Sequence, residues 1–159
     1  MGKFKFLSAD DLADSEIYLE IEKALPGAIP LYVMHIVRAE DHTIVGQITL
    51  QVADGEMVYF IGHIGYRVNE AFRGNNYALK ACRLIIRQAR KHNMKELIIT
   101  CNPDNIPSRR TLERLGGALK EIVPLPVEHE LYQKGDREKC IFMFDIEEVL
   151  RPCLVSPIR

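Results

Sequence analysis

The sequence predicts an α/β fold (strictly α+β), in which about seven strands form one mixed, mostly antiparallel central sheet flanked by helices. Apolar residues alternate along much of the first half of the chain, as they do in half-buried strands. They recur at helical spacing in two segments of the second half. A strand–helix–strand succession in the middle requires a crossover, so we expect one central strand pair to be parallel.

The N-terminal part is predicted to contain a strand, a helix and then a strand meander. Residues 3–7 alternate as a strand does. Residues 11–24 carry apolar side chains in a loosely helical pattern, which Pro26 and Gly27 end. Polar turns then join three strands into an antiparallel meander. These strands are expected over 31–39, 44–52 and 57–68.

The second half is predicted to alternate helices and strands. Residues 76–91 place apolar side chains at helical spacing. A second helix is expected over 106–115, with Asn105 as its N-cap and Gly116 as a left-handed C-cap. The remaining strands are expected over 95–101, 119–125 and 139–146.

Composition and length bound the class of protein. The chain of 159 residues, with 47% hydrophobic and 27% charged residues, fits one globular domain over 1–150 with a frayed tail over 151–159. A net charge of -1 provides no basic field for nucleic acid or an anionic membrane. We find no signal peptide and no apolar run long enough to span a membrane, so a cytoplasmic protein is expected. The four scattered cysteines indicate reduced thiols and no metal site.

The most informative segment is the connection between a strand that ends near Val68 and the helix that follows Asn76. Successive N–H groups in such a turn, next to a helix N-terminus, form a cradle for phosphate oxygens. Gly74 and the asparagines accept left-handed backbone angles, and the small Ala78 leaves room for a large anion. An ordinary strand-to-helix connection explains the same spacing equally well.

This connection resembles the signature of the GNAT superfamily of acetyltransferases, Arg/Gln-x-x-Gly-x-Gly/Ala between the fourth strand and the third helix. Residues 73–78 read Arg-Gly-Asn-Asn-Tyr-Ala, and Asn76 replaces the central glycine. Because Asn is the least costly substitute at a positive φ, we expect the loop to survive. A second similarity is Asn105 after a strand, followed by Ser108 and by the helix-ending Gly116-Gly117. The resemblance spans at least residues 44–146.

The resemblance implies direct transfer of the acetyl group of acetyl-CoA to a primary amine of an unidentified small molecule or protein N-terminus. It implies that the pyrophosphate lies on the N–H groups of the loop and that pantetheine pairs with the end of the fourth strand. The N–H of Val68 would bind the thioester carbonyl. The coenzyme-binding residues would be Tyr66, Val68, Arg73, Gly74, Asn75, Asn76, Tyr77, Ala78, Asn105 and Ser108.

The sequence departs from the family in the residues that move protons. Leu112 stands where many members have a tyrosine acid, and Thr100 stands where others have a glutamate base. His63 is the first candidate base, because an imidazole titrates near neutral pH; a structural histidine is the alternative. Further titratable side chains are Glu56, Glu70, Tyr77 and Tyr132.

Several alternatives stay open at this point. The missing acid and base make a non-catalytic acyl-CoA-binding sensor conceivable, and the same fold serves other acyl donors or acceptors. The expected partners are acetyl-CoA and an amine-bearing acceptor, without nucleic acid or membrane. A homodimer through the C-terminal strands is left open. The basic stripe on the first long helix is typical of a solvated face.

Overall fold

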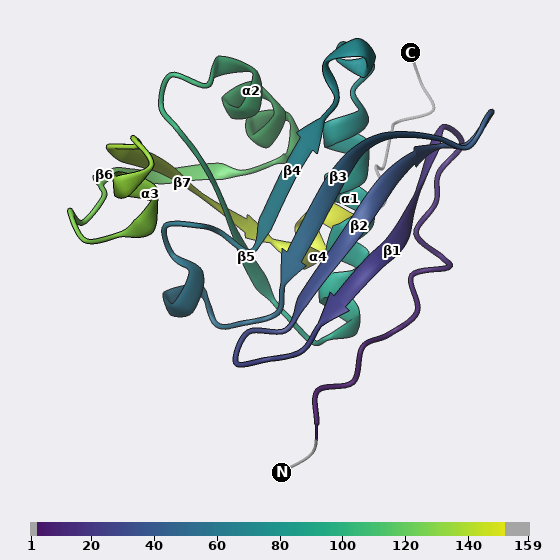
Figure 1. The fold of residues 1–159 in the computed structure, drawn as a ribbon, viewed down its shortest axis with the longest axis horizontal. Helices are drawn as coiled ribbons and strands as arrows, with labels where there is room; N and C mark the ends of the chain where they lie inside the picture. Colours follow the sequence, from purple (N-terminus) through teal and green to yellow (C-terminus); the bar gives the residue numbers. More distant parts are fainter. Residues whose placement is uncertain (1–2, 152–159) are drawn as a thin grey trace.

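The computed structural model describes residues 3–151 and divides their seven strands between two antiparallel sheets (Figure 1). Apart from Arg151, the tail expected over 151–159 lies outside the described residues. The first sheet contains, in spatial order, β1 (Ile17–Leu25), β2 (Leu31–Arg38), β3 (Thr43–Gln51) and β4 (Ile64–Val68). The second contains, in spatial order, β5 (Glu96–Cys101), β7 (Glu138–Asp145) and β6 (Ala118–Pro124).

Helices cover one side of this strand arrangement. The long helix α1 (Tyr77–Lys91) packs on β1, β3 and β4, and also contacts both α2 (Ile106–Leu115) and α4 (Ile146–Leu150). Its buried face, which includes Leu84, Ile85 and Ile86, completes the hydrophobic core beneath the sheets. Three short helical turns complete the fold: η1 (Gly55–Val58), η2 (Glu70–Phe72) and α3 (Glu130–Gln133). No helix in the described part of the chain is long and apolar enough to cross a membrane.

The predicted single sheet with a parallel strand pair is wrong. Within residues 3–151, β4 and β5 form no ladder, and they are joined where the His63 N–H donates to the Ile98 carbonyl at 2.7 Å. The His63 carbonyl accepts from Gln51 of β3 on the other side. The chain is therefore irregular at His63, and Gly62 before it has φ +83°. Beyond this point the two strands separate, so the expected pairing is absent (Figure 1).

The predicted N-terminal elements are also wrong. Residues 3–7 form no strand, and the helix expected over 11–24 is absent. Its apolar residues Ile17, Leu19 and Ile21 instead belong to β1, where they alternate with Tyr18 and more polar neighbours. Their spacing fits a loose helical period, but a period of two fits it as well, and pairing with β2 selects the strand.

The strand expected over 57–68 is broken. Residues 55–58 form η1, and only 64–68 are extended, because the intervening turn is held by the Thr100 hydroxyl, which donates to the Phe60 carbonyl at 3.0 Å. The hairpin of β2 and β3 and the helices α1 and α2 confirm the sequence predictions to within a residue or two. The short helices α3 and α4 were not expected.

Candidate functional site

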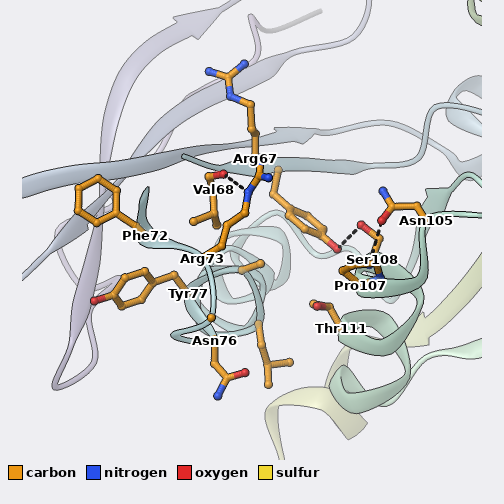
Figure 2. Close-up of a pocket in the computed structure, with 14 residues that line it drawn as sticks. Arg67, Val68, Phe72, Arg73, Asn76, Tyr77, Asn105, Pro107, Ser108 and Thr111 are labelled. Atoms are coloured by element: carbon orange, nitrogen blue, oxygen red, sulfur yellow. Dashed lines mark hydrogen bonds between the residues drawn. The ribbon is translucent and has the colours of Figure 1, made fainter. Parts of the chain in front are cut away.

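A cavity of about 460 Å³ lies where β4, the following loop and the N-termini of α1 and α2 meet (Figure 2). Nine of the ten residues that the sequence suggests for coenzyme binding line it, and Asn75 does not. Phe72, Pro107 and Thr111 also line it, and the sequence did not single them out for this role. The lining includes Arg67 and Arg73 and no acidic residue, so the cavity favours an anionic ligand.

The edge of β4 that faces the cavity offers unpaired backbone groups. Asn69 donates to Val45 of β3, and His63 accepts from Gln51 of β3, so the odd-numbered residues of β4 face β3. The N–H groups of Tyr66 and Val68 therefore point to the opposite edge, where β5 has separated from β4. The Val68 carbonyl on this edge accepts from Arg73 Nε at 3.0 Å.

The loop after β4 exposes the start of α1. Gly74 has φ +92° and Asn76 has φ +61°, so Asn76 takes the left-handed conformation expected of the residue that replaces glycine. The Asn76 side chain makes no cap bond to α1, because its Oδ1 accepts from Arg114 Nη1 at 2.8 Å. The first N–H groups of this helix, which is 15 residues long, therefore carry their partial positive charge uncapped at the cavity.

The opposite wall of the cavity is the first turn of α2. Asn105 caps this helix, since its side chain accepts from the Ser108 N–H at 3.2 Å, and Pro107 occupies the first turn. The Tyr66 hydroxyl donates to Ser108 Oγ at 3.2 Å. This hydrogen bond joins β4 to the first turn of α2.

Sequence reasoning missed the contact of Arg114 with Asn76, a residue that lines the cavity. Arg114 lies in the last turn of α2, 38 residues from its partner Asn76. No local signal predicts this pairing, because it depends on the packing of α2 against α1. The basic stripe on α1 consists of Lys80, Arg83, Arg87 and Arg90. Two of these residues pair elsewhere: Lys80 lies 2.9 Å from Glu16, and Arg90 lies 3.6 Å from Glu147.

The structure does not bring His63 to this cavity. The His63 side chain is 2% exposed and lines a separate hollow of about 560 Å³. Its Nε2 lies 2.8 Å from the Ala53 carbonyl, and its Nδ1 accepts from the Ile98 N–H at 2.9 Å, which together define the neutral ring protonated on Nε2. Both nitrogens are therefore committed to the backbone, and this geometry favours the structural alternative over a catalytic base.

The other proton-transfer candidates also lie away from the cavity or point elsewhere. Leu112 and Thr100 occupy the positions of the acid and the base in members of the GNAT superfamily. Leu112 is fully buried, and the Thr100 hydroxyl donates to the turn before β4. The Tyr77 hydroxyl lies beside Arg38, on the side of α1 away from Ser108 (Figure 2). Tyr132 belongs to α3, where the Arg137 guanidinium lies 3.9 Å from its ring centroid. Glu56 and Glu70 lie in the short turns η1 and η2.

We expect stability to fall as the pH drops below about 6.5, the ordinary pKa of histidine. Desolvation lowers the pKa of His63 and of His92, so the unfolded chain binds more protons than the folded chain between their folded pKa values and 6.5. The contribution of the two histidines to the free energy of unfolding is therefore fully present above pH 6.5, and it is lost as the pH falls through their pKa values in the folded protein. Urea unfolding between pH 5 and 8 measures this. A free energy of unfolding that stays constant over this range would contradict the expectation; the aspartates with lowered pKa act only nearer pH 4.

Comparison with known proteins assigns the chain to a family. The family model described as the acetyltransferase (GNAT) domain matches residues 5–118, which include the whole cavity. The uncharacterized N-acetyltransferase YnaD of Bacillus subtilis is 33% identical over 94 residues, which are 56% of this chain and 53% of the relative. The chain therefore spans about half the length of the curated relative it matches.

Solved structures show the same fold at low sequence identity. A GNAT-family acetyltransferase from Bacillus anthracis has a TM-score of 0.58 and 19% identity, over 72% of this chain and 66% of that chain. RimJ of Mycobacterium smegmatis, in complex with CoA-disulfide, has a TM-score of 0.58 and 22% identity, over 74% of this chain and 54% of that chain. The microcin C7 self-immunity acetyltransferase MccE, in complex with acetyl-CoA and AMP, has a TM-score of 0.57 and 19% identity, over 72% of this chain and 61% of that chain. The family match over most of the chain and the shared fold together show that this protein belongs to the GNAT acetyltransferases.

Proposed function

We propose that the protein is an N-acetyltransferase that binds acetyl-CoA in the cavity between β4 and α2 and transfers the acetyl group to a primary amine. One observation carries this proposal. A single cavity contains an uncapped helix N-terminus and, beside it, a strand edge with unpaired N–H groups. The first feature suits a diphosphate, and the second suits an extended chain that contains amides.

The residues of the cavity divide this work. The N–H groups from Gly74 to Ala78 would hold the diphosphate. The edge of β4 from Tyr66 to Val68 would pair with pantetheine, and the Val68 N–H would polarise the thioester carbonyl. The solved neighbours that bind acetyl-CoA or a CoA disulfide support this assignment of the coenzyme.

The acceptor amine would attack the thioester directly. Its nitrogen forms a bond to the carbonyl carbon, the carbon–sulfur bond breaks, and the amine proton passes to water. The proposal assigns no side chain as base, because His63 has both ring nitrogens bonded to the backbone. We propose that the acceptor is the primary amine of a small molecule or of a protein N-terminus. The described residues hold no cluster of His, Cys, Asp or Glu suited to a metal ion, and the proposed reaction requires none.

Calorimetric titration with acetyl-CoA, followed by an assay of thiol release with a panel of amines, tests the proposal. We expect a dissociation constant on the order of micromolar and thiol release with at least one amine. Binding without thiol release across a broad panel would favour the acyl-CoA sensor. This alternative is consistent with Leu112 and Thr100, which occupy the positions of the acid and the base in other members of the family. Absence of binding would refute the assignment of the cavity.

A further inference from the structure

The Tyr66 hydroxyl has no role in the proposed function as stated so far. Tyr66 lies on β4 between Ile64 and Val68, and the side chains of these alternate residues face the helices. Its ring crosses the cavity, and its hydroxyl donates to Ser108 Oγ at 3.2 Å. The Ser108 N–H is in turn fixed by Asn105 Oδ1 at 3.2 Å. The phenol is therefore held at a defined point on the cavity wall.

Tyr66 is also the suitable donor by comparison with the other polar groups that line the cavity. Arg67 alternates with Tyr66 and Val68 along β4, so its side chain lies on the opposite face of the sheet. Arg73 Nε already donates to the Val68 carbonyl at 3.0 Å. Tyr77 directs its hydroxyl to Arg38, outside the cavity. The alcohols of Ser108 and Thr111 are weaker acids than a phenol. Among the described residues that line the cavity, Tyr66 thus presents the one phenolic O–H to its interior.

The environment of Tyr66 keeps this O–H intact. Burial raises the pKa of Tyr66 to about 12. The phenol is therefore neutral at physiological pH and available as a donor. A hydrogen bond to a charged acceptor is strengthened in such a partly desolvated position, because fewer water molecules compete for it.

We propose that Tyr66 donates its hydroxyl hydrogen bond to the coenzyme sulfur as the carbon–sulfur bond breaks, and so stabilises the departing thiolate. This proposal rests on the proposed function, since it requires the thioester to lie at the edge of β4. The electron pair of the broken bond stays on sulfur, the Tyr66 proton stays on oxygen, and the thiolate takes up a proton from water to leave as a thiol. Ser108 holds the hydroxyl in place by accepting its hydrogen bond when sulfur is not there to accept it.

The test is the ionisation of the thiol of bound coenzyme A, which needs no knowledge of the acceptor. The thiolate is followed by its ultraviolet absorbance as the pH is raised, with the sulfur-free analogue dethia-CoA as the blank. Free coenzyme A titrated alongside provides the reference pKa. We expect the wild type to lower the thiol pKa by about one pH unit, which means about tenfold preference for the thiolate. Tyr66→Phe should abolish this preference and leave the affinity for dethia-CoA within about twofold.

The controls separate this role from a structural one. Tyr132→Phe removes a hydroxyl outside the cavity and should keep the wild-type thiol pKa. If the thiol pKa is lowered equally in the wild type and in Tyr66→Phe, the proposal is overturned. The lowering of the pKa would then be caused by the N-terminus of α1. An unshifted thiol in the wild type would overturn it without any variant. In either case retained coenzyme binding would leave the proposed function standing, whereas failure of the wild type to bind coenzyme A or dethia-CoA would refute that function itself.

Discussion

Ala78→Glu should abolish coenzyme binding and leave the protein folded. Ala78 is half-buried in the first turn of α1 and lines the cavity. A carboxylate there fills the space and repels the diphosphate, so we expect the dissociation constant for acetyl-CoA to rise at least about 100-fold. The same charge stabilises a helix N-terminus by about 0.3–1 kcal/mol, so the melting temperature should stay equal or rise. Calorimetric titration and thermal unfolding measure the two effects.

The opposite signs of these two effects make the experiment specific. Arg90→Gln is the matched control, because it changes the charge of α1 by the same amount at the far end of the helix, where Arg90 is exposed. We expect its affinity for acetyl-CoA to stay within about threefold of the wild type, since the charge is distant and screened. Tight binding by Ala78→Glu would mean that the coenzyme lies elsewhere.

The second large effect is expected at His63, and it concerns stability. His63→Ala leaves the buried Ile98 N–H and the half-buried Ala53 carbonyl without these partners and creates a cavity. Each unpaired group costs about 1–3 kcal/mol, so we expect the free energy of unfolding to fall by about 2–5 kcal/mol. Chemical denaturation at pH 7.5 measures this loss.

Two comparisons decide what His63 does. His35→Ala, in which the removed ring lies 3.7 Å from the Glu22 carboxylate on the open sheet face, should cost less than about 1 kcal/mol. The folded fraction of His63→Ala, assayed at low temperature, should bind acetyl-CoA with nearly wild-type affinity. If this variant is as stable as the wild type and loses turnover with a shifted pH profile, His63 would instead be the catalytic base.

The parts of the structure that the sequence predicts well are those in which few residue types are tolerated. Gly74 and Asn76 both take positive φ, and Gly116 ends α2 at φ +104°. Asn105 caps α2 as its position before Pro107 suggests. These residues are chosen by local backbone geometry, which is encoded within a few positions of the chain.

The parts that were missed depend on contacts between distant segments. Ile17 and Leu19 fit a loose helical period as well as an alternating one, and only pairing with β2 selects the strand. The point at which the two sheets meet is the contact between His63 and Ile98, which are 35 residues apart in the chain. The sequence around His63 does not contain the groups that bond to it, and the same is true of the sequence around Ile98. The division into two sheets therefore cannot be predicted from either segment alone.

The division into two sheets also has a consequence for how the chain folds. Each sheet is formed from one continuous stretch, residues 17–68 and residues 96–145. In the first sheet every strand pairs with its neighbour along the chain, so short loops close and the entropic cost of each pairing is small. Each stretch can thus assemble locally before both dock on α1. The cavity between β4 and α2 lies at the seam between these two units, so it forms only once both have docked.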